Sequence, residues 1–240
     1  MSFAVTIIRQ SNAGPSAARN AGIRAATSEY VAVLDGDDRL LPKFLKRVVD
    51  AVESDSSVVA ASGWLSTFGV LESVVRPSGG TIVDFLPRNC CPATCIIRRS
   101  VWERCGGYDE SMRSGFEDWD CSLSLLESGG DDARIVVVPE PLIQYRTAPA
   151  SPNITSMSKR LDLMRYLISK HHASYSAYLA EVITGVEAIS IGRLSMWERA
   201  VQTRPELMDE DPSTTEFMAH PTYGDGGMAA AVRIRSVAAK

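Results

Sequence analysis

Short apolar runs alternate with helical patterns through the first part of the chain. Phe3–Ile8 is an apolar run of strand length, and the turn residues of Asn12–Ser16 follow it. The alanine-rich stretch Ala17–Ala26 predicts a helix that begins near Pro15, because proline suits the first helical turn. Tyr30–Leu34 is a continuous apolar run, which predicts a strand that is covered on both faces.

A second helix is predicted after Pro42. Apolar residues recur along one face of it at helical spacing: Phe44, Leu45, Val48, Val49 and Val52. The succession of strand, helix, strand and helix favours an α/β domain with a parallel sheet, in which ligands collect at the carboxyl ends of the strands. The acidic turn Asp35–Asp38 lies at such an end.

The same kinds of pattern continue as far as residue 145. Five further strands are expected, at 58–65, 68–75, 94–98, 135–138 and 142–145. A short helix is expected at 101–105, closed by Gly106 and Gly107. An amphipathic helix is expected at 116–128, ended by Gly129, because four apolar residues recur at helical spacing: Phe116, Trp119, Leu123 and Leu126.

From about residue 159 the pattern is helical alone. One face carries Leu161, Met164, Leu167 and Ile168, and helical stretches continue to about Val201. We therefore expect an α/β domain at 1–150 and a helical appendage at 151–204. The remaining stretch, 205–240, carries Pro, Gly, Asp and Ser without periodicity, so we expect a flexible tail.

The composition limits the class of protein. A chain of 240 residues with 45% apolar residues can form one globular domain with a sizeable core and an appendage. A net charge of −4 argues against a broad nucleic-acid surface, which needs clustered Lys and Arg. No apolar run reaches the roughly 18 residues that cross a bilayer, and Met1–Val5 has no signal-peptide pattern. We expect a cytoplasmic protein with no nucleic-acid partner.

Five cysteines lie between residues 90 and 121. Their number is odd and their spacing is not typical of a zinc site, which favours reduced and mostly buried thiols. A metal site made by Cys90, Cys91 and Cys95 is the weaker alternative, because adjacent cysteines seldom point at one ion.

Three carboxylates lie within four residues, at Asp35, Asp37 and Asp38. They repel one another unless a cation neutralises them. Oxygen ligands suit Mg or Mn, and such an ion often completes its shell with phosphate oxygens of a substrate. An Asp-x-Asp in a solvated turn is also common by chance, so the turn alone does not identify a metal site.

Two blocks of motifs together resemble the family 2 glycosyltransferases of the GT-A fold. The first block comprises Asn12–Ile23, Tyr30–Asp38 and Pro42, and the second comprises Cys95–Ser100, Gly106–Glu110 and Gly115–Asp120, followed by Tyr145-Arg146. The resemblance covers roughly residues 3–147. It implies an α/β GT-A domain, a mixed sheet flanked by helices, with a C-terminal helical appendage.

The resemblance also implies roles on the donor side of a site. Asp37 would ligate a divalent metal, Mn or Mg, with Asp35 at the metal or the ribose and Asp38 at the donor. Three further residues would bind the nucleotide-sugar donor: Asn12, Arg19 and Asn20. Arg19 would approach the diphosphate, for which a forked cation is well suited. A surface arginine that caps a neighbouring strand is the alternative for Arg19.

Glu117 and Asp118 resemble the family's Glu-Asp pair, in which the aspartate is the general base on the acceptor hydroxyl. An inverting transfer needs one carboxylate near the acceptor oxygen and no covalent nucleophile. A helix N-terminus favours an ionised Asp118, whereas burial and the negative donor raise its pKa. An acidic pair that only stabilises the helix is the alternative. Trp119 lies on the apolar stripe, so we expect it to pack in the core rather than to stack on a sugar.

The chain departs from the family pattern in three places. Family members often carry a histidine after Tyr-Arg, where this chain has Thr147-Ala148-Pro149, so a third metal ligand stays unassigned. The Gln-x-x-Arg-Trp signature of processive members is absent, which favours a single transfer. Family members begin with a strand, helix and strand that hold the nucleotide base, and this chain begins at the third strand. A start codon assigned too late and a real truncation both account for that difference.

The expected function is metal-dependent, inverting and non-processive glycosyl transfer in the biosynthesis of cell-surface polysaccharide. The donor would be a nucleotide sugar, and the acceptor a carbohydrate or a lipid-linked molecule at the inner face of the membrane. One alternative is a catalytically inactive remnant that acts as a binding protein. A nucleotidyltransferase and a phosphohydrolase are the others, but the sequence after Asp37 does not follow the phosphohydrolase pattern.

Overall fold

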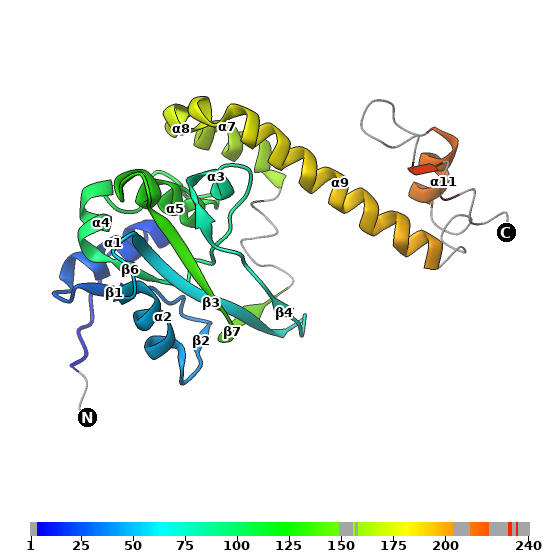
Figure 1. Ribbon diagram of the computed structural model, residues 1–240. Coiled ribbons are helices and arrows are strands. Elements are labelled where there is room, and N and C mark those ends of the chain that lie inside the picture. The colour runs from blue at the N-terminus through cyan, green and yellow to red at the C-terminus, as the bar shows by residue number, and fades with distance from the viewer. Residues whose placement is uncertain are drawn as a thin grey trace. The chain divides into compact units, whose positions relative to one another are not determined.

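The computed structural model describes residues 4–148, 156, 158–203, 212–220, 230–231 and 234. The chain divides into two compact units, Met1–Leu179 and Ala180–Lys240. The first unit contains a sheet with helices packed against it (Figure 1). Within the second unit, Trp197, Val201, Met218 and Ile234 pack together. Most of the tail that we expected to be flexible, 205–240, lies outside the described residues.

The described part of the first unit contains a seven-stranded mixed sheet. Its strands are β1 (Tyr30–Ala32), β2 (Arg39–Leu40), β3 (Val58–Gly69), β4 (Val74–Val75), β5 (Gly80–Thr81), β6 (Ile96–Arg98) and β7 (Arg134–Thr147). The main path is β1-β6-β3-β7-β2, with β4 beside β3 and β5 beside β7. Strands β3 and β7 are parallel, whereas β6 is antiparallel to both β1 and β3. The mixed sheet implied by the resemblance is confirmed, and the parallel sheet expected from the alternation is wrong.

Seven helices are described in the first unit up to residue 178, and two more follow. They are α1 (Pro15–Ala25), α2 (Phe44–Glu53), α3 (Ile82–Phe85), α4 (Arg99–Cys105), α5 (Glu117–Ser128), α7 (Arg160–Lys170), α8 (His172–Ala177), α9 (Leu179–Thr203) and α11 (Pro212–Ala219). The expected helices near Pro15, after Pro42, at 101–105 and at 116–128 are confirmed. Gly106 ends α4 in the left-handed conformation, φ 84°, in which glycine has no Cβ penalty.

The expected strands are wrong in extent. Those at 30–34 and 94–98 are shorter, the one at 68–75 divides between β3 and β4, and the two at 135–138 and 142–145 form one strand. Strand β3 runs without interruption through 58–69, and β7 runs through 134–147. The two strands pair along their whole lengths, and the register shifts where Gly63 faces Val138 and Trp64 faces Pro141. The two residues of β7 between these pairs form a bulge, so the prolines there bend the strand without ending it.

The strand expected at Phe3–Ile8 is wrong: residues 4–8 form no strand. Val5 is 83% exposed and Ile7 is 76% exposed. An apolar run forms a stable strand only when its backbone pairs with a neighbour and one face is buried. Neither condition holds for this segment.

A hydrophobic core between α2 and the sheet fixes the frame of the first unit. Phe44, Val48 and Val52 are fully buried on the inner face of α2, while Leu45, which we expected on that face, is 54% exposed. The strands contribute Ala61, Leu65, Ile96, Leu142 and Ile143. This packing holds β1 and β2 in place and therefore fixes both ends of the acidic turn between them.

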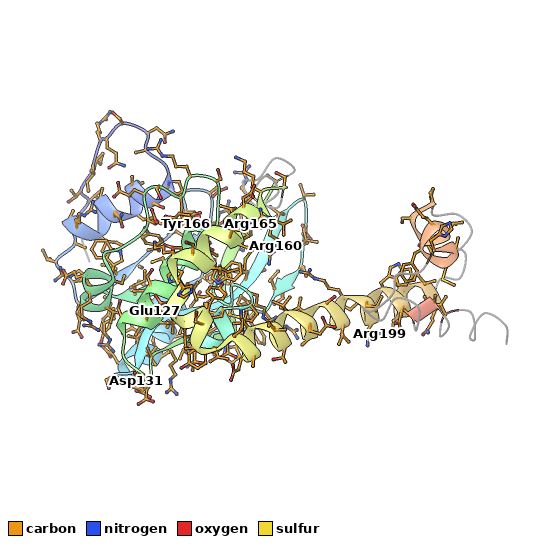
Figure 2. All side chains as sticks on the ribbon, turned by 90° about the horizontal axis from the view of Figure 1, so that it is seen from above. Glu127, Asp131, Arg160, Arg165, Tyr166 and Arg199 are labelled. Atoms are coloured by element: carbon orange, nitrogen blue, oxygen red, sulfur yellow. The ribbon has the colours of Figure 1, made fainter. Side chains whose placement is uncertain are left out.

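A buried polar network joins α7 and α8 to α5. His171 lies 3.1 Å from the Asp120 carboxylate through Nε2 and 2.8 Å from the Glu127 carboxylate through Nδ1. Lys170 lies 2.8 Å from Asp120 and 2.9 Å from Asp109. Figure 2 labels Glu127 of α5 and, on α7, Arg160, Arg165 and Tyr166. Because Asp120 is fully buried, losing either partner would leave a buried carboxylate with an incomplete set of partners.

Replacing His171 by alanine should destabilise the fold by about 3–5 kcal/mol, the cost of leaving a buried charge with an incomplete partner set. Burial alone lowers the pKa of His171, but hydrogen bonds to Asp120 and Glu127 outweigh it and raise the pKa to about 9. The pKa of His171 is higher in the folded protein than in the unfolded chain, so its contribution to stability is complete below a pH of about 6.5, the unfolded pKa. That contribution is lost as the pH rises through the folded pKa of about 9. The free energy of unfolding in urea should therefore differ more between wild type and His171→Ala at about pH 6 than at about pH 10.

The matched control is His172→Ala, because His172 is the exposed neighbour of His171. It should leave stability within about 0.5 kcal/mol of wild type at both pH values. An equal loss at both pH values for His171→Ala would contradict the ionic role of His171.

Candidate active site

A groove with a volume of about 540 Å³ lies between α1 and β1 and reaches the acidic turn. Small residues on α1 leave room for it, since Ala18 and Gly22 line one wall. The opposite wall is β1, an edge strand that pairs with β6 on one side. The strand expected to be covered on both faces is covered on one, because Val31 and Val33 are buried while Leu34 is 43% exposed.

The carboxylates of the acidic turn take three different directions. The Asp35 carboxylate lies 2.8 Å from Arg19. The Asp38 carboxylate is buried and accepts a hydrogen bond of 2.8 Å from the backbone N–H of Arg146. Asp37 is exposed. Within the described part of the chain, no group of three or more His, Cys, Asp or Glu side chains converges as a metal site.

The electrostatics of the turn fit a cation nonetheless. Burial raises the pKa of Asp38, the backbone N–H of Arg146 lowers it, and the charges of Asp37 and Asp35 raise it further. Arg19 offsets the charge of Asp35, but the like charges of the three carboxylates still act on one another. Mg and Mn are typically held by one or two carboxylates with substrate phosphates completing the shell. The exposed Asp37 carboxylate and the second oxygen of Asp35 supply such a set.

Arg19 connects the two motif blocks. Its side chain is 9% exposed, and its guanidinium lies 2.8 Å from Asp35 through Nη2 and 2.9 Å from Glu117 through Nη1. The same guanidinium lies 5.4 Å from the ring centre of Tyr108, within the range of a cation–π contact. Arg19 is thus not the surface arginine of the alternative. One fork of hydrogen-bond donors holds the acidic turn and the start of α5 together.

Asn20 makes its hydrogen bonds within the protein, and its expected contact with the donor stays a prediction. Asn20 is 1% exposed. Its amide donates to the Tyr108 carbonyl and to Glu110, each at 2.8 Å, and its oxygen accepts the Tyr108 N–H at 2.9 Å. These bonds occupy the amide inside the protein, so Asn20 ties α1 to the loop after α4.

Asn12 lies in the exposed loop before α1. Its side-chain oxygen accepts a hydrogen bond of 3.1 Å from the Gly14 N–H. Gly14 has a φ of 92°, a conformation that favours glycine, so the local turn depends on both residues. The expected contact between Asn12 and the donor stays a prediction.

The start of α5 presents the acidic pair. Phe116 precedes the helix in the left-handed region, φ 67°, which is uncommon for a residue with a large side chain. Glu117 and Asp118 follow as the first helical residues. The guanidinium of Arg160, on α7, lies 5.4 Å from the ring centre of Phe116 and 5.8 Å from that of Trp119. The strained residue is therefore covered by packing from a distant part of the chain.

The Asp118 carboxylate accepts one hydrogen bond on each oxygen. The Trp119 N–H donates to Oδ1 and the Asn89 amide donates to Oδ2, both at 2.9 Å. Burial raises the pKa of Asp118 to about 6, the Glu117 charge adds to the rise, and the Trp119 N–H and the charge of Arg19 oppose it. Asp118 is therefore ionised at neutral pH and close to its titration range, as suits a general base.

Trp119 is 2% exposed, and its indole N–H donates to the Phe85 carbonyl at 2.7 Å. Its expected place in the core is confirmed. The five cysteines are free in the structure, four of them buried and Cys105 half-buried, which confirms that they are mostly buried.

Two residues at the site have no signal in the sequence pattern. Asn89 lies in a non-periodic segment, and Arg160 lies beyond the part of the chain that carries the motifs. Both reach the start of α5 through packing between distant segments. A shift toward turn residues before Cys90 is the local feature that could have pointed to Asn89.

The first 104 residues match the description "Glycosyl transferase family 2". The chain is 43% identical over 185 residues to the succinoglycan biosynthesis protein ExoO of Rhizobium meliloti (strain 1021), with 70% of this chain and 51% of that protein covered. It is 33% identical over 150 residues to the pre-mycofactocin glycosyltransferase of Mycobacterium tuberculosis (strain ATCC 25618 / H37Rv), with 55% and 30% covered. The solved structure of S. aureus TarS, residues 1–349, has a TM-score of 0.48 at 15% identity, with 96% and 64% covered. The chain thus spans 51% of the length of ExoO and 30% of the length of the Mycobacterium tuberculosis protein.

Proposed function

The chain belongs to glycosyltransferase family 2, and from that premise we propose that it transfers a sugar from a nucleotide-diphosphate sugar to an acceptor hydroxyl. The observation that carries the proposal is the Arg19 bridge. Arg19 holds Asp35 at 2.8 Å and Glu117 at 2.9 Å, which brings the acidic turn and the acidic pair close together and supports a shared site. An acidic turn alone, or a helix that begins with acidic residues, would not have this connection.

On the donor side, Asp37 and Asp35 would hold Mn or Mg. When bound, the cation would neutralise the diphosphate as it leaves with the electron pair of the sugar–oxygen bond. Arg19 contributes a second positive charge at the same turn. Asp38, turned inward to the Arg146 N–H, fixes the loop and leaves the outer face of the turn to Asp37.

On the acceptor side, Asp118 would take the proton of the attacking hydroxyl as the new glycosidic bond forms. Its fixed orientation and a pKa of about 6 suit that role at neutral pH. A single carboxylate acting as base, with no enzyme nucleophile, gives inversion at the sugar carbon. The reaction we propose is therefore inverting, with one sugar transferred for each encounter.

We propose a carbohydrate or lipid-linked acceptor in cell-surface polysaccharide synthesis, because the similar ExoO protein is named for succinoglycan biosynthesis. Such acceptors place the reaction at the inner face of the membrane. Among the described helices, none has the length and apolar character that a membrane span needs.

Calorimetry with a panel of nucleotide sugars tests the donor side. Binding that needs Mn or Mg and discriminates among the nucleotides is the expected result. The inactive remnant, the main alternative, would bind none of them with or without metal. A nucleotidyltransferase would instead bind nucleoside triphosphates and release diphosphate from them.

A further inference from the structure

Asn89 is the side chain of the described structure that hydrogen-bonds to the Asp118 carboxylate. Its amide nitrogen lies 2.9 Å from Oδ2, on the oxygen that the Trp119 N–H does not contact. Asn89 is half-buried and lies in the loop between α3 and β6. The contact joins residues 29 positions apart in the sequence, so it depends on how this loop packs against α5.

The orientation of the Asn89 amide is determined by its second hydrogen bond. The side-chain oxygen accepts the Cys91 N–H at 3.2 Å. In the opposite orientation, the amide oxygen would face the Asp118 carboxylate and the amide nitrogen would face the Cys91 N–H. Both contacts would be repulsive, so the donor group is directed to Asp118.

The loop that carries Asn89 is itself anchored at four points. The Cys90 carbonyl accepts the Gly79 N–H at 3.0 Å, and the Cys90 thiol donates to the Asp84 carbonyl at 3.3 Å. Further along, the Thr94 carbonyl accepts the Ser62 hydroxyl at 2.7 Å, and the Cys95 carbonyl accepts the Val33 N–H at 2.9 Å. A side chain held by such a loop is preorganised and pays little entropy when it binds a carboxylate.

We propose that Asn89 is a positioning residue for glycosyl transfer: its amide holds the Asp118 carboxylate in the orientation and the ionised form in which it accepts the proton of the acceptor. This assignment rests on the proposed function of Asp118. A hydrogen bond to the charged form of a carboxylate favours that form over the protonated one. Asn89 therefore opposes the effects of burial and of Glu117, which favour the protonated form.

The other groups that face Asp118 do not replace this contact. Glu117 is a like charge, and Arg19 is already shared between Asp35 and Glu117. A cavity of about 10 Å³ beside Asp118 is lined by Cys91, Cys95, Tyr108 and Cys121, among other residues. Burial raises the pKa of the Cys91, Cys121 and Tyr108 groups, which are therefore neutral at physiological pH. A cavity of that size has room for about one water molecule.

The test is a series of variants at one position, measured across pH. Asn89→Leu has a similar volume and no donor, and Asn89→Asp places a second carboxylate against Asp118. The midpoint of the acidic limb of the kcat/KM profile should move to higher pH, by about one pH unit in Asn89→Leu and by more in Asn89→Asp. At a pH well above the limb, Asn89→Leu should recover to within about tenfold of wild type, because Asp118 is then ionised without help.

The same shift should be visible without turnover, in a carbon-13 NMR titration of the Asp118 carboxyl, assigned by its loss in Asp118→Asn. The control is Arg88→Ala, which removes the exposed neighbour of Asn89 and should leave both profiles unchanged. An unchanged limb and an unchanged Asp118 titration in Asn89→Leu would overturn the assignment, as would an equal loss of rate at every pH. Full transfer by Asp118→Asn would overturn the proposed function of Asp118 instead, and the NMR titration would still report whether Asn89 sets its ionisation.

Discussion

Asp118→Asn should reduce the rate of sugar transfer by about 10²- to 10⁴-fold, the contribution that general-base catalysis typically makes. The amide has nearly the shape of the carboxylate but cannot take up the proton of the acceptor. Donor affinity should stay within about threefold of wild type, because the expected donor contacts lie at the acidic turn and not on α5. Steady-state kinetics with calorimetry of the donor measures both quantities.

The control for that substitution is Asp131→Asn. Asp131 is an exposed aspartate in the turn after α5 and belongs to neither motif block (Figure 2). It should leave rate and affinity unchanged. If Asp118→Asn transfers sugar at the wild-type rate, Asp118 is not the base, and the alternative that the acidic pair only stabilises α5 is correct.

Asp37→Ala should have the second large effect, a loss of turnover of about 10²-fold or more, because a metal ion stabilises developing charge by several kcal/mol. The exposed Asp37 carboxylate is available to a cation, whereas Asp35 is shared with Arg19 and Asp38 is turned inward. The Mn or Mg concentration needed for half-maximal rate should rise in the variant. A titration of the metal at saturating donor measures this shift.

Asp132→Ala is the matched control for Asp37→Ala, since it removes another exposed aspartate. It should keep the metal dependence of wild type. An Asp37→Ala protein with an unchanged metal requirement would place the cation elsewhere, and wild-type turnover in a chelator would remove the metal from the reaction altogether.

Local signals in the sequence were sufficient to predict the two helices that carry the site, α1 and α5. Pro15 and the alanine-rich stretch after it predict α1, and the apolar stripe that includes Trp119 predicts α5. Both signals act within a few residues: the ring of a proline, or a face that repeats every 3.6 residues. The motif spacing then placed the acidic turn after β1 and the acidic pair at the start of α5.

The strands depended on pairing that the sequence does not specify locally. The run at Phe3–Ile8 has the composition of a strand, but its described residues, 4–8, pair with no strand of the described structure. Two strands were expected on either side of the β7 prolines, yet β7 continues past them because a bulge in β7 keeps it paired with β3. In both cases the outcome is decided by a distant segment, since a strand completes its hydrogen bonds between segments and a helix completes them within one.

The site shows the same limit for polar side chains. The resemblance implied that Arg19 and Asn20 both lie near the donor, but adjacent positions on a helix point in different directions. Arg19 faces the acidic turn, whereas Asn20 faces Tyr108, which lies 88 positions away in the sequence. Such contacts form only when distant segments of the chain pack together in the folded domain. The sequence could therefore identify the motifs and could not assign each side chain to the donor or to the protein.

The central claim is that the acidic turn and the Glu117–Asp118 pair form one metal-dependent site for transfer from a nucleotide sugar. Release of nucleoside diphosphate from a panel of nucleotide sugars, with Mn or Mg, tests it most directly when wild type, Asp37→Ala and Asp118→Asn are measured together. We expect release from at least one donor by wild type, and a loss of about 10²-fold or more in both variants. Release that both variants sustain at the wild-type rate, or no release from any donor by wild type, would contradict the claim.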